Sequence, residues 1–304
     1  MSDCELLGKR VLVTGGAGFI GSHIADVVND GNDLRVIDNL SDGSLKNVPS
    51  DAEFVEADIR DADALADAMD GVDVVFHEAA MVSVPESVNA PVECHDTNGT
   101  ATVRLLDEAR ANDSRVVFAS SAAIYGHPET LPVSEDAPKK PASPYGLEKL
   151  SGDYYTRLFA DRYGLETVNL RYFNVYGPRQ TGGQYAGVVT TFLDQAADGG
   201  PITVEGDGEQ TRDFVHVDDV VQANLRAATT EATGTSYNVG TGSNITILEL
   251  AETIQRLSDT DQDIVHTDPR PGDIEESEAD ISKAREQLGY EPTKSVKDGL
   301  AELI

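Results

Sequence analysis

The sequence predicts an α/β fold in which a doubly wound parallel sheet is accompanied by a smaller, discontinuous C-terminal α/β substrate lobe. A glycine-rich turn directly follows a buried apolar run, an acid ends the next apolar run, and further apolar runs are separated by helix-length segments. Right-handed crossovers between such runs give a parallel sheet with helices on both faces. The expected strands are 10–14, 34–37, 53–56, 72–76, 115–120 and 166–172.

The glycine turn follows the first expected strand, and Gly16, Gly18 and Gly21 have the GxGxxG spacing. Such a turn lets the backbone approach a pyrophosphate, which then lies at the N-terminus of the following helix. Asp38 ends the second strand, where a carboxylate accepts ribose hydroxyls and repels a 2′-phosphate. These features predict a Rossmann site for a dinucleotide, with NAD favoured over NADP.

The pattern changes from about Tyr176, where short strands and helices alternate with loops that contain glycine and proline. We therefore expect an NAD-binding domain over 1–175 and a substrate-binding lobe over 176–304. Two strand-like segments in the region 213–240, namely 214–217 and 236–239, are expected to return to the main sheet. Such returns make the second lobe discontinuous.

The charge is strongly acidic, because 54 Asp and Glu face 23 Lys and Arg and give a formal net charge of -31. Such a chain repels nucleic acid and anionic membranes, so we expect neither as a partner. Self-repulsion of this size destabilises a compact protein unless salt screens it. We therefore infer a halophile's protein that is adapted to a high-salt cytoplasm, with an ordinary acidic mesophile protein as the alternative.

No apolar stretch is long enough to span a membrane, and the first strand begins by Arg10, so we expect neither a membrane anchor nor a signal peptide. A cytoplasmic location follows from this expectation. Cys4 and Cys94 are too few for a disulfide framework, and the six histidines have no ligand spacing. We therefore expect no metal.

A tyrosine and a lysine, Tyr145 and Lys149, are four residues apart on a helix expected to begin near Pro144, so both lie on one face. A nearby ammonium and the positive nicotinamide of NAD favour the phenolate, which can then act as a base. Ser121 follows the fifth expected strand, where its hydroxyl can donate to a substrate oxygen. Taken alone, each feature is also compatible with an ordinary helix pair or a capping serine.

With these residues, the chain resembles the extended short-chain dehydrogenase/reductase family, and within it the nucleotide-sugar epimerases of the UDP-glucose 4-epimerase type. The resemblance covers essentially the full length. Its motifs are 14–21, 58–60, 77–80, 120–126, 145–149, 171–179, 206–215 and 270–273.

The resemblance implies a site residue by residue. The residues expected to take part in catalysis are Ser121, Tyr145 and Lys149. The residues expected to bind NAD are Gly15, Gly18, Phe19, Ile20, Gly21, Asp38, Asn39, Ser41, Gly43, Asp58, Ile59, Ala79, Ala80, Thr97, Tyr145, Lys149 and Phe173. The residues expected to bind the nucleotide sugar are Ser83, Ser121, Asn174, Arg212, Arg270, Asp273 and Ser277.

The resemblance also implies epimerisation at carbon 4 through a transient 4-keto sugar, because Ala122 and Ala123 stand where related dehydratases carry Asp and Glu. UDP-glucose and UDP-galactose are the expected substrates. The small Ser277 leaves room for N-acetylated sugars as well. A UDP-glucuronate-acting epimerase or decarboxylase, an NDP-sugar dehydratase or reductase, and a non-catalytic dinucleotide-binding module are the alternatives. A homodimer is expected to form through the helices near 91–111 and 144–163.

Overall fold

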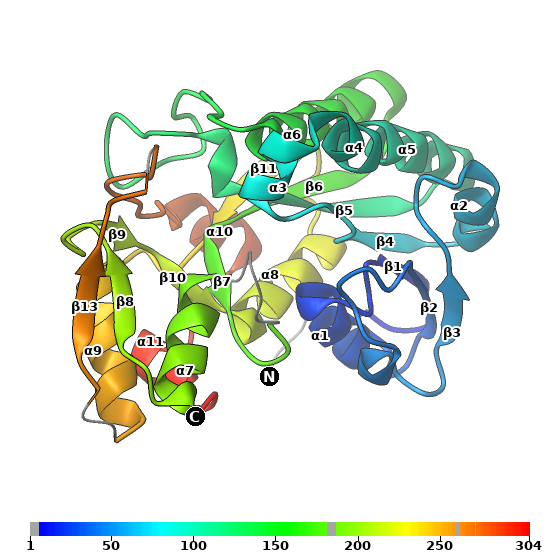
Figure 1. Ribbon diagram of the computed structural model, residues 1–304. Coiled ribbons are helices and arrows are strands. Elements are labelled where there is room, and N and C mark those ends of the chain that lie inside the picture. Colours follow the sequence, from blue (N-terminus) through cyan, green and yellow to red (C-terminus); the bar gives the residue numbers. More distant parts are fainter. Residues whose placement is uncertain (1–5, 181–186, 260–261, 271) are drawn as a thin grey trace.

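A seven-stranded parallel sheet forms the centre of the computed structural model (Figure 1), which describes residues 6–180, 187–259, 262–270 and 272–304. The strand order is β11-β6-β5-β4-β1-β2-β3, so the order reverses between β1 and β4. This arrangement confirms the predicted fold class. The strands are β1 (Arg10–Thr14), β2 (Asp33–Asp38), β3 (Glu53–Glu56), β4 (Val74–His77), β5 (Arg115–Ser121), β6 (Thr167–Tyr172) and β11 (Thr235–Val239).

Helices cover both faces of this sheet, with α5 and α6 above it and α1 and α8 below it in Figure 1. Successive side chains of a strand point to opposite faces of the sheet. Each strand therefore contributes to two hydrophobic cores, one on each face. Val11 and Val13 pack with residues of α1 and α8, whereas Leu12 packs with α2 and α5. The helices are α1 (Phe19–Val28), α2 (Ala62–Met69), α5 (Ala101–Asn112), α6 (Pro144–Tyr163) and α8 (Val217–Thr229).

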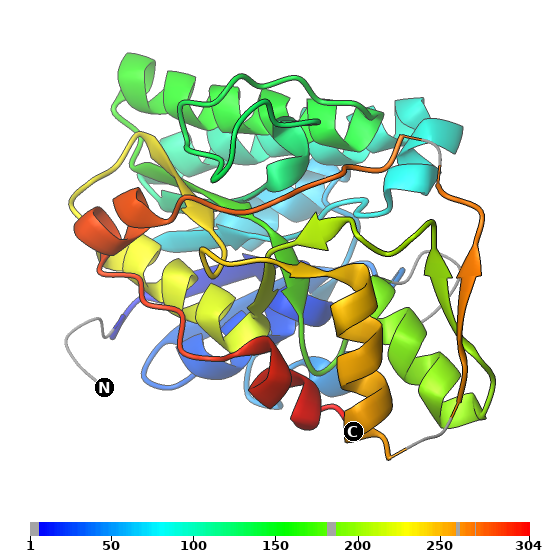
Figure 2. The same cartoon turned by 90° about the vertical axis from the view of Figure 1, so that its left-hand side faces the viewer.

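The second lobe has its own core, in which Phe192, Val204 and Leu250 are buried. Its strands pair as β8 (Ile202–Glu205) with β13 (Ile264–Thr267) and β9 (Thr211–Arg212) with β12 (Ile245–Thr246). Figure 2 shows the segment that precedes α10 crossing from this lobe back over the main sheet. The helices of this part are α7 (Val188–Asp198), α9 (Ile247–Leu257), α10 (Ser282–Leu288) and α11 (Val296–Ala301).

One of the two expected strand returns is wrong. Residues 236–239 do return, within β11, which pairs with β6. Residues 214–216 instead form β10 (Phe214–His216), which pairs with β7 (Asn174–Tyr176) in a separate two-stranded sheet. The reason is that β11 already occupies the free edge of β6, and that Val217 begins α8 rather than extending the strand. The division at residue 175 stays a prediction.

Short helices complete the layer that holds α6, namely α3 (Val84–Asn89), α4 (Pro91–Cys94) and the π-helix η2 (His95–Thr100). Two 3-10 turns, η1 (Leu45–Asn47) and η3 (Ala122–Ile124), follow β2 and β5. Within the described ranges, no helix has both the length and the apolar character needed to cross a membrane.

Candidate active site

The glycine turn after β1 lies against the backbone that follows β4. Gly15 has a φ of +69°, and a Cβ there would lie 2.8 Å from the backbone N of Ala79. A Cβ on Gly21 would collide with the carbonyl oxygen of Gly15. Gly18 is the N-cap of α1 and provides no side-chain cap, so the first N–H groups of the helix stay available. The turn therefore fits a pyrophosphate at the helix N-terminus.

Asp38, at the end of β2, holds this turn in place. Its carboxylate accepts hydrogen bonds from the backbone N of Ala17, at 3.0 Å, and of Leu40, at 2.8 Å. A carboxylate has about four acceptor positions, so capacity remains for ribose hydroxyls. Gly43 lies against Ala17, where a Cβ would approach the backbone to 2.9 Å. The expected adenosine loop is thus folded onto the glycine turn.

The other residues expected near adenosine are linked to this loop. The Asn39 side chain donates to Asp58 at 3.1 Å, and the backbone N of Ser41 donates to Asn39 at 3.1 Å. Hydrogen bonding from Arg60 holds the pKa of Asp58 at about 2. Ile59 is buried in the core beside α2. Asn39, Ser41 and Asp58 therefore form one polar loop, with Ile59 packed beneath it.

A buried histidine fixes the backbone at Ala79. The Thr14 hydroxyl lies 2.8 Å from His77 Nδ1 and accepts a hydrogen bond from the Ala79 N–H at 3.2 Å. His77 Nε2 lies 3.0 Å from the Thr102 hydroxyl. Burial lowers the pKa of His77 to about 3, so the ring is neutral at physiological pH. This chain of contacts sets the distance between β4 and the glycine turn.

Thr97, half-buried, lies on the π-helix η2. The next residue, Asn98, accepts from the Met81 N–H at 2.8 Å and donates to the Met81 carbonyl at 2.9 Å. This pair of bonds joins η2 to the Ala79–Ala80 segment directly before Met81. Single π-helical turns are frequent at functional sites.

Tyr145 and Lys149 lie on the first turns of α6, as predicted. Ser143 caps this helix by accepting a hydrogen bond from the Gly146 N–H at 3.1 Å. The Lys149 ammonium lies 6.0 Å from the centroid of the Tyr145 ring and donates to the Ala119 carbonyl at 2.7 Å. The helix therefore places the phenol and the ammonium together beside the end of β5.

Burial shifts both groups toward their neutral forms. It raises the pKa of Tyr145, and a hydrogen bond with Ser121 opposes that rise. Burial also lowers the pKa of Lys149 to about 8, an effect that the charge of Glu78 opposes. A phenol that lines a cavity and a buried ammonium beside it, both with displaced pKa values, are typical of a site that moves protons.

The sequence pattern assigns no role to Glu78, although this residue belongs to the motif at residues 77–80. Its Oε1 accepts a hydrogen bond from the Tyr172 hydroxyl at 2.8 Å, and burial raises its pKa to about 7. Its position in the sequence is the one indication of a functional role, because Glu78 directly follows β4 and so lies at the carboxyl edge of the sheet. No local pattern could identify its neighbours on α6 and β6.

A cavity of about 220 Å³ opens beside these groups. Its walls come from both halves of the chain, with Ser121 and Tyr145 on one side and Arg212 and Ser277 on the other. Ser277 is placed there because the following residues bridge to Val133, whose N–H donates to the Glu278 carbonyl at 2.8 Å. Further expected residues in the lining are Phe173 and Asn174, together with Ala122 and Ala123.

The structure separates the two expected substrate arginines. Arg212 lines the cavity and pairs with Asp273 at 2.6 Å, and burial lowers its pKa. Arg270 is exposed and pairs with Glu205 at 3.0 Å. Ser83 caps α3 by accepting from the Glu86 N–H at 3.1 Å. Neither Arg270 nor Ser83 is in the cavity lining formed by the described residues.

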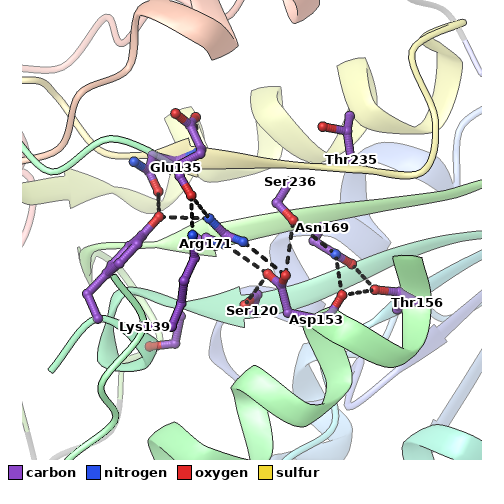
Figure 3. Close-up of polar contacts among 12 residues, drawn as sticks. Ser120, Glu135, Lys139, Asp153, Thr156, Asn169, Arg171, Thr235 and Ser236 are labelled. Carbon is purple, nitrogen blue, oxygen red and sulfur yellow. Dashed lines mark hydrogen bonds and ion pairs between the residues drawn. The ribbon is translucent and has the colours of Figure 1, made fainter. Parts of the chain in front are cut away.

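A buried polar network joins α6 to the sheet (Figure 3). The Asp153 carboxylate accepts from Arg171 at 2.8 and 2.9 Å, from Ser120 at 3.2 Å and from Ser236 at 3.1 Å. These residues come from α6, β6, β5 and β11. Asp153 lies one turn after Lys149, so the network fixes the face of α6 that carries Tyr145 and Lys149 relative to Ser121.

Among the described residues, one group has the geometry to hold a metal ion, namely His216, Asp218 and Glu302. The Lys294 ammonium is already paired with both acids and lies 3.6 Å from Asp218. His216 and Asp218 are two residues apart, but Glu302 is distant in the sequence, so no ligand spacing could indicate the whole group. Cys4 lies outside the described residues.

Comparison with known proteins agrees with this geometry. The chain is 40% identical over 306 residues to the UDP-glucose 4-epimerase of Mycolicibacterium smegmatis, and the alignment covers 97% of each chain. The solved UDP-N-acetylglucosamine 4-epimerase from Methanobrevibacter ruminantium, in complex with UDP-N-acetylmuramic acid, has a TM-score of 0.94 at 38% identity and covers 98% of this chain and 97% of its own. The UDP-glucose 4-epimerase of Thermotoga maritima, solved with UDP-glucose, has a TM-score of 0.93 at 39% identity and covers 96% of each chain.

The family whose profile matches residues 11–240 is described as the NAD dependent epimerase/dehydratase family. The match confirms the expected cofactor, NAD, and the expected class of enzyme. The glycine turn, the adjacent Tyr145 and Lys149 and the cavity lined by both halves of the chain fit this family. The chain belongs to the NAD dependent epimerase/dehydratase family.

Proposed function

We propose that the protein is a 4-epimerase of nucleotide-diphosphate hexoses that interconverts UDP-glucose and UDP-galactose. The observation that carries this proposal is the cavity in which Ser121 and Tyr145, from the NAD-binding part, face Arg212 from the second lobe. Two similar proteins, from Mycolicibacterium smegmatis and Thermotoga maritima, are named UDP-glucose 4-epimerases. Their names support UDP as the carrier nucleotide.

In this proposal Tyr145 is the base that removes the proton of the sugar 4-hydroxyl. Ser121 hydrogen-bonds the same oxygen, and Lys149 stabilises the phenolate by its charge. NAD, when bound, supplies reversible two-electron redox chemistry at carbon 4. After the 4-keto sugar has turned over in the cavity, Tyr145 returns the proton. The protein therefore ends the cycle in its starting state.

Two sets of residues hold the ligands in this proposal. The nucleotide sugar is held by Asn174, Arg212 and Asp273. Arg270 joins them after it leaves its exposed ion pair with Glu205. Breaking that ion pair costs little, because exposed pairs contribute only about 0–1 kcal/mol. Ser83 completes the set from α3. The residues that bind NAD are those of the glycine turn, the β2 loop and the wall beside them: Gly15, Gly18, Phe19, Ile20, Gly21, Asp38, Asn39, Ser41, Gly43, Asp58, Ile59, Ala79, Ala80, Thr97, Tyr145, Lys149 and Phe173.

Epimerisation is favoured over dehydration by the residues after Ser121. Ala122 and Ala123 line the cavity, and the resemblance aligns them with the Asp and Glu of related dehydratases. A dTDP-glucose 4,6-dehydratase from Streptomyces venezuelae is among the similar structures, so the common fold does not separate the two reactions. We therefore base the choice of epimerisation on the side chains beside Ser121.

We infer that N-acetylated hexoses are accepted as well. Ser277 lines the cavity, and its small side chain leaves space beside the sugar. One similar structure is named a UDP-N-acetylglucosamine 4-epimerase. A large aromatic side chain at this position would fill that space.

We also propose a homodimer through the helices near 91–111 and 144–163, namely α4, η2, α5 and α6. Leu147, Tyr154 and Leu158 are exposed and recur at helical spacing along one face of α6. Val92, on the neighbouring α4, is 73% exposed. A second copy of the chain would cover this apolar face, as isologous contacts do in two-fold dimers.

Finally, we propose that the protein works in a high-salt cytoplasm of a halophile. The support is its net charge of -31, which low salt leaves unscreened.

A proton NMR time course tests the activity. Purified protein in concentrated KCl is given UDP-glucose, UDP-N-acetylglucosamine, UDP-glucuronate or dTDP-glucose without added reductant. Interconversion at carbon 4 without net NAD reduction is the expected result. A 4-keto-6-deoxy product would instead identify a dehydratase, a pentose would identify a decarboxylase, and no change would contradict the proposal.

A further inference from the structure

A buried acid lies behind the part of the cavity wall that the second lobe provides, and the proposed mechanism gives it no role. Asp213 joins β9 to β10 and directly follows Arg212, which lines the cavity. We propose that Asp213 positions Arg212 and Asn174 together with the segment that carries Ser277, and so sets the affinity for the nucleotide diphosphate. This inference rests on the proposed function. Asp213 is itself absent from the lining formed by the described residues, so it is a positioning residue.

The carboxylate of Asp213 ties two separate segments together. Its Oδ1 accepts hydrogen bonds from the backbone N and the hydroxyl of Thr241, each at 2.7 Å. Its Oδ2 accepts from the N–H groups of Gly242 and Ala279, each at 3.1 Å. Thr241 and Gly242 follow β11, an edge strand of the main sheet, whereas Ala279 lies two residues after Ser277. The carboxylate therefore joins the loop after β11 to the segment that carries Ser277.

The backbone around Asp213 holds two further cavity residues. Its carbonyl accepts from the N–H of Asn174, the first residue of β7, at 3.0 Å. Arg212, directly before it, pairs with Ile245 of β12, the strand that follows the loop after β11. Asn174, Arg212 and the segment of Ser277 thus meet at one residue, although they come from distant parts of the sequence.

The environment of this side chain is matched to a carboxylate. Asp213 is 0% exposed, and its four partners, three backbone N–H groups and one hydroxyl, all donate to it. Burial raises the pKa of Asp213, and the hydrogen bonds from Thr241, Ala279 and Gly242 oppose that rise. A carboxamide would turn its NH₂ group toward at least one of these backbone N–H groups in either orientation. An uncharged side chain of the same shape therefore leaves buried donors without an acceptor, and the joined segments should shift apart.

The test is the variant Asp213→Asn, and its expected effect is on KM. Contacts with the diphosphate are remote from carbon 4, so they stabilise the bound ground state and the transition state alike. KM for UDP-glucose should rise by about 10-fold or more, while kcat changes far less. The amount of NAD retained after gel filtration should not change, because the hydrogen bonds of Asp213 reach neither the glycine turn nor the β2 loop.

Asp219→Asn is the matched control. Asp219 is 1% exposed, and its carboxylate likewise accepts from the backbone N and the hydroxyl of a threonine, Thr293, at 2.8 and 2.9 Å, and from the Lys294 N–H at 3.2 Å. It ties α8 to a segment outside the described cavity lining. Both variants should be less stable than the wild type in urea, but Asp219→Asn should keep the wild-type KM. An unchanged KM in Asp213→Asn, or an equal rise in both variants, would overturn the proposal, because Asp213 would then only support the fold.

A milder variant keeps the test decisive if Asp213→Asn does not fold. Thr241→Val removes one of the four donors, the hydroxyl, and leaves the carboxylate in place. KM for UDP-glucose should rise in the same direction, by about 3-fold. A folded Thr241→Val protein with the wild-type KM would count against the proposal.

Binding of UDP separates this inference from the proposed function, because it needs no turnover. In calorimetric titrations, the Kd for UDP should rise in Asp213→Asn and stay at the wild-type value in Asp219→Asn. Weakened binding in a protein without epimerase activity would support the positioning role while the proposed function fails. Epimerisation with unchanged UDP binding in Asp213→Asn would overturn the inference and leave the proposed function standing. A wild-type protein that binds no UDP would overturn both.

Discussion

Arg171 and Asp153 form a doubly hydrogen-bonded ion pair that is almost completely buried, with side chains 1% and 0% exposed. Arg171 Nε and Nη2 donate to the two carboxylate oxygens at 2.8 and 2.9 Å. Asp153 is one helical turn beyond Lys149, and Arg171 lies on β6. The pair therefore fixes the helix that carries the proposed base, Tyr145, relative to the sheet.

Replacing Asp153 by Asn should destabilise the protein by about 3–5 kcal/mol, because a buried guanidinium loses its partner. Urea unfolding at constant high salt measures this cost. Asp107→Asn breaks the exposed Asp107–Arg110 pair, 2.7 Å long, and should cost less than about 1 kcal/mol. Equal losses in the two variants would contradict the structural role given to the buried pair.

Tyr145→Phe should lower kcat by about 10²–10⁴-fold, because it removes the hydroxyl that takes the proton. NAD should stay bound, since the glycine turn and the β2 loop are unchanged. Turnover and the amount of NAD retained after gel filtration are the two measurements. Tyr155→Phe, another exposed position on the same helix, should leave turnover unchanged. Normal turnover in Tyr145→Phe would exclude Tyr145 as the base.

Ser277→Tyr should abolish activity on UDP-N-acetylglucosamine while activity on UDP-glucose persists. The reason is that the new ring fills the cavity space beside the sugar. The ratio of kcat/KM for the two substrates measures the effect, and Ser277→Ala should keep the wild-type ratio. An unchanged ratio in Ser277→Tyr would mean that this position does not face the N-acetyl group.

Leu158→Glu should convert the proposed dimer to a monomer, because it buries a carboxylate in an apolar contact. Light scattering coupled to gel filtration measures the mass. Val265→Glu, at a 42% exposed position on β13, is the control and should not change the mass. A wild-type protein that is already monomeric would refute the dimer itself.

Salt should stabilise the fold. The screening length falls from about 10 Å at 0.1 M to about 3 Å at 1 M salt, so the repulsion among the excess acids weakens. The midpoint of thermal unfolding should therefore rise between about 0.1 M and about 1 M KCl. An equally stable and active protein at both concentrations would contradict the adaptation to high salt.

The sequence by itself determined the features that depend on neighbouring residues. The six predicted strands are confirmed because apolar runs bounded by turn residues form buried strands almost independently of context. The start of α6 at Pro144 is likewise encoded locally, by a serine cap followed by proline.

Only the tertiary structure decided which distant groups meet. It placed β10 beside β7 instead of the main sheet, and it separated Arg270 from the cavity that Arg212 lines. It also brought Glu78 to Tyr172, across 94 positions of the chain. Such contacts depend on strand order and on how the helices pack, and pairings between distant residues leave no local pattern in a single sequence. The physical reason is that local periodicity fixes which face is buried, whereas the partner on that face is fixed by the assembled fold.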